Sequence, residues 1–129
     1  MDRGHDLDKK PCILIVEDEP ILALELKEDL ADLGYCISEV VADADMVLHA
    51  FLRNRPDIVL MDIKLHGFRD GIDSATQIRG FYQTPIVFLS SYPEVEVGTR
   101  LQKAAPYAYI QKPYEVPALE KVLTSVLGA

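Results

Sequence analysis

Five short aliphatic runs alternate with segments of helical periodicity, and this alternation constrains the fold more than any other feature. The runs have strand length and are bounded by polar or turn residues: CILIV at 12–16, CISEVVA at 36–42, DIVLM at 57–61, PIVFL at 85–89 and YAYI at 107–110. The first, third and fourth runs are almost uniformly apolar, which is typical of central strands covered on both faces of a parallel sheet.

Helical spacing fills the intervals between these runs. In the first interval, apolar residues recur every three or four positions between a proline suited to a first turn and a glycine suited to a helix end: Leu22, Leu26, Leu30 and Leu33. Similar repeats predict helices around 44–51, 72–78 and 119–126. The interval PEVEVGTRLQKA at 93–104 contains a glycine and β-branched valines, so we expect a weak, mobile helix there. This alternation predicts an α/β fold, a parallel sheet with helices on both faces.

Length and charge limit the function classes. A chain of 129 residues fits one domain, and its net charge of -8 argues against binding a nucleic-acid backbone, which needs clustered Lys and Arg. No apolar run approaches the roughly 20 residues that span a bilayer, and the start, MDRGHDLDKK, lacks the apolar stretch of a signal peptide. We therefore expect a cytoplasmic protein with no membrane or direct nucleic-acid contact, beginning with a flexible polar tail at 1–10.

The two cysteines show neither a CxxC motif nor metal-type spacing. For a cytoplasmic chain, this favours reduced, buried thiols at Cys12 and Cys36 over a disulfide.

Polar residues follow four of the predicted strands. In open α/β sheets, ligands bind beyond the carboxyl ends of the strands, so residues at these points are expected to meet at one edge. They are Glu17 and Asp18 after the first strand, Asp62 after the third, Ser90 and Ser91 after the fourth and Lys112 shortly after the fifth. Taken singly, each has an ordinary reading, such as acids at a helix start. Together they predict a site.

Clustered carboxylates repel one another unless a cation compensates them. Oxygen ligands, some acting through water, suit Mg²⁺. With the charge offset, Asp62 could approach an anionic phosphoryl donor and act as a carboxylate nucleophile.

These residues, in this order and at strand ends, resemble the receiver domains of two-component response regulators. The resemblance covers about residues 11 to 128 and rests on the acid pair Glu17-Asp18, on Asp62, on the hydroxyl residue Ser90 and on Lys112-Pro113. It implies a flavodoxin-like, doubly wound five-stranded sheet with strand order 2-1-3-4-5. It also implies a receiver domain over 11–129, after the tail.

The family's chemistry, carried to matching positions, implies that Asp62 accepts a phosphoryl group from a phosphohistidine on a histidine kinase or phosphotransfer protein. Asp18 and Asp62 would ligate Mg²⁺, Glu17 would act largely through water, and the backbone carbonyl of Lys64 would complete the protein's ligands. Lys112 would pair with the phosphoryl oxygens.

The resemblance also implies a switch. Ser90 would move toward the phosphoryl group, and the ring of Tyr109 would fill the space it leaves. The change would reach the face made by the last two helical segments and the fifth strand, and the peptide bond before Pro113 would be cis. The stretch LHGFRDG departs from the usual pattern by an extra residue, so the loop above Asp62 is expected to differ in shape.

Three other functions remain open at this stage: a phosphate sink, a phosphorylation-independent binding domain and an aspartate-nucleophile phosphatase. The phosphatase usually needs a second Asp two residues after the nucleophile, where this chain has Lys64. We expect no turnover beyond Mg²⁺-dependent self-phosphorylation and self-dephosphorylation. Since the sequence ends with the last helix, we also expect an effect exerted through an effector protein, with a phosphorylation-dependent homodimer as a further possibility.

Overall fold

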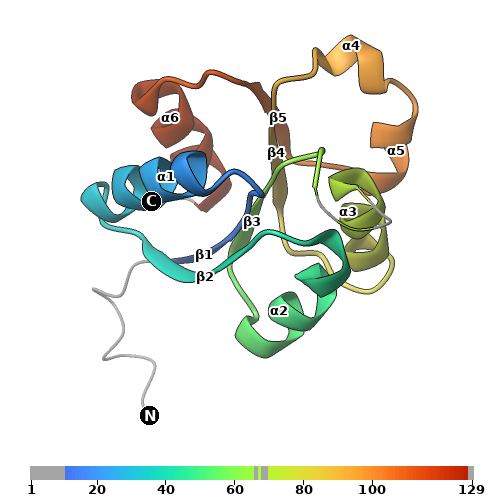
Figure 1. Cartoon of the computed structure of the whole chain (residues 1–129), viewed down its shortest axis with the longest axis horizontal. Helices are drawn as coiled ribbons and strands as arrows, with labels where there is room; N and C mark the ends of the chain where they lie inside the picture. The colour runs from blue at the N-terminus through green and yellow to red at the C-terminus, as the bar shows by residue number, and fades with distance from the viewer. Residues whose placement is uncertain (1–10, 66, 68–69, 128–129) are drawn as a thin grey trace.

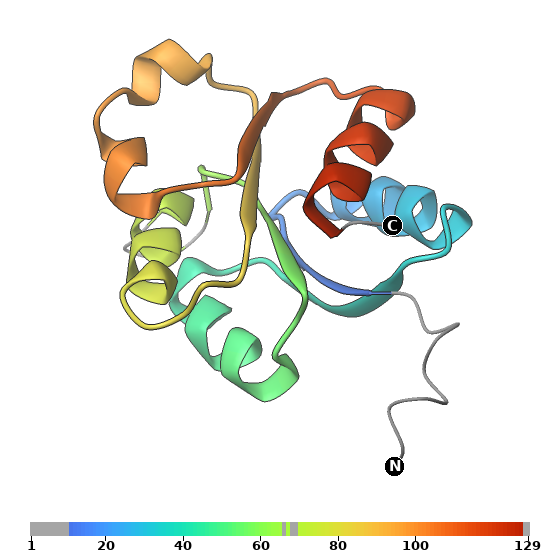
Figure 2. The same cartoon turned by 180° about the vertical axis from the view of Figure 1, so that it is seen from behind.

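A parallel five-stranded sheet forms the centre of the protein in the computed structural model, which describes residues 11–65, 67 and 70–127 (Figures 1 and 2). The strands are β1 (Cys12–Val16), β2 (Cys36–Val41), β3 (Ile58–Met61), β4 (Ile86–Ser90) and β5 (Ala108–Gln111). Their order is β2-β1-β3-β4-β5, and all pairs are parallel. The predicted fold class and strand order are confirmed, and the predicted strands agree to within a residue at each end.

Helices cover both faces of this sheet (Figure 1). Helices α1 (Pro20–Asp32) and α6 (Val116–Leu127) pack on one face, over a buried cluster that includes Ile13, Leu60 and Leu119. The other face carries a short 3₁₀ turn, η2 (Ala44–Met46), with α2 (Val47–Asn54), α3 (Gly71–Arg79), α4 (Glu94–Val97) and α5 (Arg100–Ala104). The buried strand residues alternate between the two layers, as the period of a strand requires.

The weak fourth helical segment is broken in two. Gly98 separates α4 from α5 with a φ of 48°, a left-handed value that suits glycine. None of the residues of α4 is buried, whereas α5 anchors itself through Leu101 and Ala104. The predicted weakness of this segment therefore appears as a single exposed turn followed by a short, docked helix.

The prediction of reduced, buried cysteines is wrong: Cys12 and Cys36 form a disulfide. The two residues are direct partners in the parallel ladder between β1 and β2, with Cα atoms 4.4 Å apart, and Cys36 is exposed. Strand pairing at the sheet edge created this proximity, and a separation of 24 residues gave no sign of it.

Within the described part of the chain, no helix has the length and apolar character needed to cross a membrane. The predicted tail at 1–10 lies outside the described residues.

Candidate functional site

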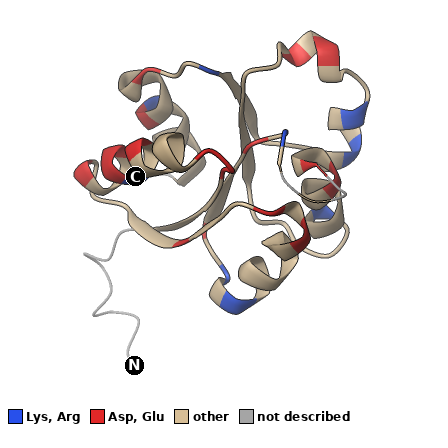
Figure 3. Cartoon of the chain, in the orientation of Figure 1, with Lys and Arg blue, Asp and Glu red and all other residues tan. Residues whose placement is uncertain are grey.

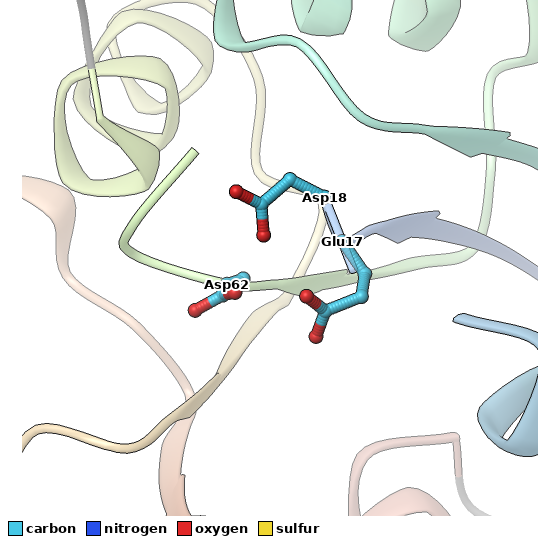
Figure 4. Close-up of side chains that lie close together, drawn as sticks. All are labelled: Glu17, Asp18 and Asp62. Carbon is cyan, nitrogen blue, oxygen red and sulfur yellow. The ribbon is translucent and has the colours of Figure 1, made fainter. Parts of the chain in front are cut away.

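Three carboxylates meet at the carboxyl edge of the sheet. Each of Glu17, Asp18 and Asp62 offers an oxygen within 4.8 Å of the others (Figure 4). Glu17 and Asp62 are only 3% and 6% exposed, so their charges are shielded from water. The structure therefore brings together the acids that the sequence placed after two different strands.

Strand register explains this arrangement. Val16 and Met61 are partners across β1 and β3, so the residues that follow them leave the sheet side by side. The Asp62 N–H donates to the Val16 carbonyl at 2.9 Å, and the Glu17 N–H donates to the Val41 carbonyl at 2.9 Å. The backbone at the base of the cluster is thus fixed by the ladder itself.

Lys112 brings a positive charge into the cluster from β5. Its Nζ donates to Glu17 Oε1 at 2.6 Å and to Asp62 Oδ2 at 3.3 Å. The Lys112 N–H donates to the Ser90 carbonyl at 2.7 Å, which places the lysine beside the end of β4, and the peptide bond to Pro113 is cis.

The charges of these groups alter one another's pKa. Burial, followed by the negative charge of Glu17, raises the pKa of Asp62 to about 7, although Lys112 acts in the opposite direction. Burial alone would lower the pKa of Lys112, but the hydrogen bond to Glu17 and the charge of Asp62 outweigh it and raise that pKa. The cluster thus has excess negative character that one ammonium does not fully offset.

Oxygen-only donors of this kind fit a hard divalent cation such as Mg²⁺. Further acidic residues, red in Figure 3, lie in the loop after β1 and in the neighbouring helix α1. A cavity of about 580 Å³ opens beside the three acids, and its lining includes Lys64, Ser91 and Lys112. Lys64 is exposed at the rim, so an approaching group can reach it.

Ser90 and Tyr109 lie on neighbouring strands at the same edge. Ser90 is 1% exposed, and its Oγ accepts a hydrogen bond from the Tyr92 N–H at 3.1 Å. The Tyr109 hydroxyl donates to the Tyr92 carbonyl at 2.6 Å. The half-buried ring of Tyr109 packs against that of Phe88, with the two ring centroids 6.2 Å apart. Burial is the main cause that raises the pKa of Tyr109. Both residues therefore contact the start of the segment that carries α4.

Helix α3 approaches the site through Gly71. Its N–H donates to the Ile63 carbonyl at 2.7 Å, and a Cβ at Gly71 would lie 1.9 Å from the Asp62 carbonyl oxygen. Only glycine allows this approach, because the atom that a Cβ would meet is a backbone oxygen, which cannot rotate away as the end of a side chain could. The loop between Asp62 and Gly71 is the one expected to contain an extra residue. Residues 66, 68 and 69 of this loop lie outside the described residues.

Some contacts around the site had no signal in the sequence. Arg100 pairs with Asp70 and Asp73 at the start of α3, and the Tyr114 hydroxyl donates to Asp29 Oδ2 at 2.6 Å, joining the loop after Lys112 to α1. Each pair joins positions far apart in the chain, so periodicity and spacing could not reveal them.

Comparison with known proteins agrees with this arrangement. The sequence model of the response regulator receiver domain matches residues 13–124. The transcriptional regulatory protein PdtaR of Mycobacterium tuberculosis is 34% identical over 112 residues, covering 84% of this chain and 54% of its own length. The chain thus spans about half the length of this curated relative.

Solved structures extend the likeness to three dimensions. The signal receiver domain of a modulated diguanylate cyclase from Desulfovibrio desulfuricans superposes with a TM-score of 0.85 at 31% identity, covering 93% of this chain and 95% of that one. The receiver domain of the sensor histidine kinase PA1611 from Pseudomonas aeruginosa, whose active site cleft coordinates a magnesium ion, gives 0.83 at 28%, covering 93% and 99%. The chain therefore belongs to the response regulator receiver domain family of two-component signalling.

Proposed function

We propose that this chain accepts a phosphoryl group on Asp62 from a histidine kinase or a histidine phosphotransfer protein, in a reaction that depends on Mg²⁺. The observation that carries the proposal is a set of three carboxylates lining a cavity, of which the two buried ones, Glu17 and Asp62, both pair with Lys112. A structural ion pair would not need a third acid or an open cavity beside it.

In the proposed reaction, an Asp62 carboxylate oxygen attacks the phosphorus of a phosphohistidine. The new O–P bond forms as the P–N bond breaks, and the imidazole leaves with the electron pair. Asp18, Asp62 and the Lys64 carbonyl would hold Mg²⁺, with Glu17 acting through water, and the ion would neutralise phosphoryl charge. Lys112, which already contacts both Glu17 and Asp62, would turn its ammonium toward the phosphoryl oxygens.

We also propose that a partner recognises the phosphorylated state at the face made by α4, α5, β5 and α6. Ser90 would be drawn toward the phosphoryl oxygens, and this would disturb its bond to the Tyr92 N–H. Since Tyr109 bonds the carbonyl of the same residue, the change would pass to the segment that carries α4. The reader of this face would be a separate effector protein or another part of a longer regulator.

Phosphoryl transfer to a small donor tests this proposal. The protein is incubated with acetyl phosphate and Mg²⁺ and followed by intact mass. Wild type should gain one acid-stable, base-labile phosphoryl adduct, because an acyl phosphate hydrolyses fastest in base. Omission of Mg²⁺ or the Asp62→Asn substitution should abolish it, whereas the matched control Asp32→Asn, at the exposed end of α1, should leave it intact.

Two further outcomes separate the competing functions, the first in this assay and the second in an assay with a phosphomonoester. A wild type without an adduct would favour a binding domain independent of phosphorylation. Continuous turnover of an added phosphomonoester, lost in Asp62→Asn, would instead favour a phosphatase.

A further inference from the structure

Arg100, the first residue of α5, ties together two elements that are thirty residues apart in the sequence. Its Nη1 donates to Asp70 Oδ2 at 2.8 Å, and its Nη2 donates to Asp70 Oδ1 at 2.9 Å and to Asp73 Oδ1 at 3.3 Å. The pairing with Asp70 is bidentate, the geometry in which a guanidinium fixes a carboxylate most firmly. In Figure 3, basic residues of α5 lie beside the acidic start of α3.

The carboxylates that Arg100 binds also begin α3. Asp70 Oδ1 accepts the Asp73 N–H at 3.0 Å, and Asp73 Oδ2 accepts the Asp70 N–H at 3.1 Å, which completes a capping box. Burial tends to raise the pKa of Asp70, but the hydrogen bonds from Arg100 and from backbone N–H groups lower it overall. The guanidinium thus holds an ionised helix cap whose position sets where α3 starts.

The start of α3 in turn abuts the backbone of Asp62. The residue after the cap, Gly71, donates its N–H to the Ile63 carbonyl and leaves no room for a side chain against the Asp62 carbonyl. A shift of Asp70 would therefore be passed on to the backbone that carries the Asp62 carboxylate, because the contact between them is already tight.

Arg100 also restrains the carboxyl-terminal end of the segment 91–99. That segment is attached at its beginning, where Tyr92 bonds Ser90 and Tyr109, and α4 within it has no buried residue. After the glycine hinge at Gly98, the ion pair of Arg100 restrains the other end. The segment is thus held by polar contacts at its two ends and by the partly buried Val97, which packs against the core. Both ends are connected to the site.

We infer that Arg100 is a positioning residue for the phosphoryl chemistry at Asp62. Through the cap at Asp70, its guanidinium holds the start of α3 against the Asp62 backbone and couples that contact to the segment 91–99. The inference rests on the proposed function. Loss of the guanidinium should loosen the backbone beneath the phosphoryl group, admit water and shorten the lifetime of the adduct.

The test compares Arg100→Gln and Arg100→Lys with a matched control, Arg53→Gln. Arg53 of α2 makes a similar two-oxygen contact to Glu39 of β2, at 2.8 and 2.9 Å from Nη2. Its side chain is similarly exposed, at 55% against 49% for Arg100. Adducts formed with acetyl phosphate and Mg²⁺ are followed by intact mass, and amide hydrogen exchange is measured on the unphosphorylated proteins.

The Arg100→Gln adduct should decay at least about threefold faster than wild type, the Arg100→Lys adduct should fall between them, and Arg53→Gln should match wild type. In the unphosphorylated Arg100→Gln protein, the Gly71 amide should exchange faster, and in Arg53→Gln it should not. Equal adduct lifetimes and equal Gly71 exchange in the two glutamine variants would overturn this inference and leave the proposed function standing. A wild type that takes up no phosphoryl group would remove the proposed function, and this inference with it.

Discussion

At the scale of single residues, the geometry at the site depends on one close backbone approach and one coupled carboxylate. Gly71 meets the Asp62 carbonyl, and Asp62 meets Glu17 and Lys112. The glycine was visible in the sequence only as part of a motif, while the structure gives it a steric reason. The carboxylates could be predicted because each directly follows a recognisable strand.

Gly71→Ala should destabilise the protein and weaken phosphoryl uptake. A Cβ would lie 1.9 Å from the Asp62 carbonyl oxygen, so the backbone of one or both residues must move, at about 1–3 kcal/mol. Urea unfolding checks the loss. The control is Gly80→Ala, where the nearest atom is 3.4 Å away, and which should shift stability by less than about 1 kcal/mol. Equal effects at the two glycines would contradict this steric account.

The raised pKa of Asp62 predicts how stability depends on pH without a cation. A carboxyl whose pKa rises from 3.8 unfolded to about 7 folded stabilises the protein fully below the unfolded value, and that contribution is lost as pH climbs through about 7. Asp62→Asn removes this titration, so its stability relative to wild type should increase between pH 4 and 8.

Thermal unfolding with and without Mg²⁺ measures this effect. The ion should raise the Tm of wild type more at pH 8 than at pH 5, because at the higher pH Asp62, with its pKa of about 7, is ionised and is repelled by Glu17. In Asp62→Asn the Mg²⁺ effect should be small at both pH values. A Mg²⁺ stabilisation that is equal in the two proteins would place the ion elsewhere.

At the scale of elements, the helix after β4 departs most from a regular pattern. The sequence predicted its weakness from Gly98 and the valines, and the structure shows the consequence as two short helices, α4 and α5. The contacts that hold α5 could not be predicted from the sequence. Arg100 and its acidic partners are far apart in the chain, and so are Arg79 and Ala104, whose carbonyl accepts from the Arg79 guanidinium.

Arg79 at the end of α3 should be important for the stability of this half of the molecule. Its guanidinium donates to the carbonyls of Tyr82 and Thr84, both at 2.9 Å, and of Ala104 at 3.4 Å. Arg79→Leu would leave these carbonyls without that donor and should lower the free energy of unfolding by about 2 kcal/mol. Arg79→Lys, which offers fewer directed donors, should lie between the two in urea unfolding. A leucine variant as stable as wild type would show that water replaces these bonds without loss.

At the scale of the whole molecule, the alternation of strands and helices determined most of what could be predicted. Parallel sheets bring strand ends to one edge, so the order of polar residues along the chain was enough to predict that Glu17, Asp18, Asp62 and Lys112 would meet. The same logic failed for Cys12 and Cys36, whose pairing depends on the register between β1 and β2. Contacts that depend on strand register or on the reach of a side chain could not be predicted from the sequence.

We propose that this arrangement makes Asp62, among all the carboxylates of the chain, the phosphoryl acceptor. Borohydride reduction can test this assignment, because it converts a phosphorylated aspartate to homoserine, which peptide mass spectrometry can locate. After incubation with acetyl phosphate and Mg²⁺, homoserine should be found at position 62 alone and should be absent without the ion. Homoserine at any other aspartate, or its formation at position 62 without Mg²⁺, would contradict this assignment.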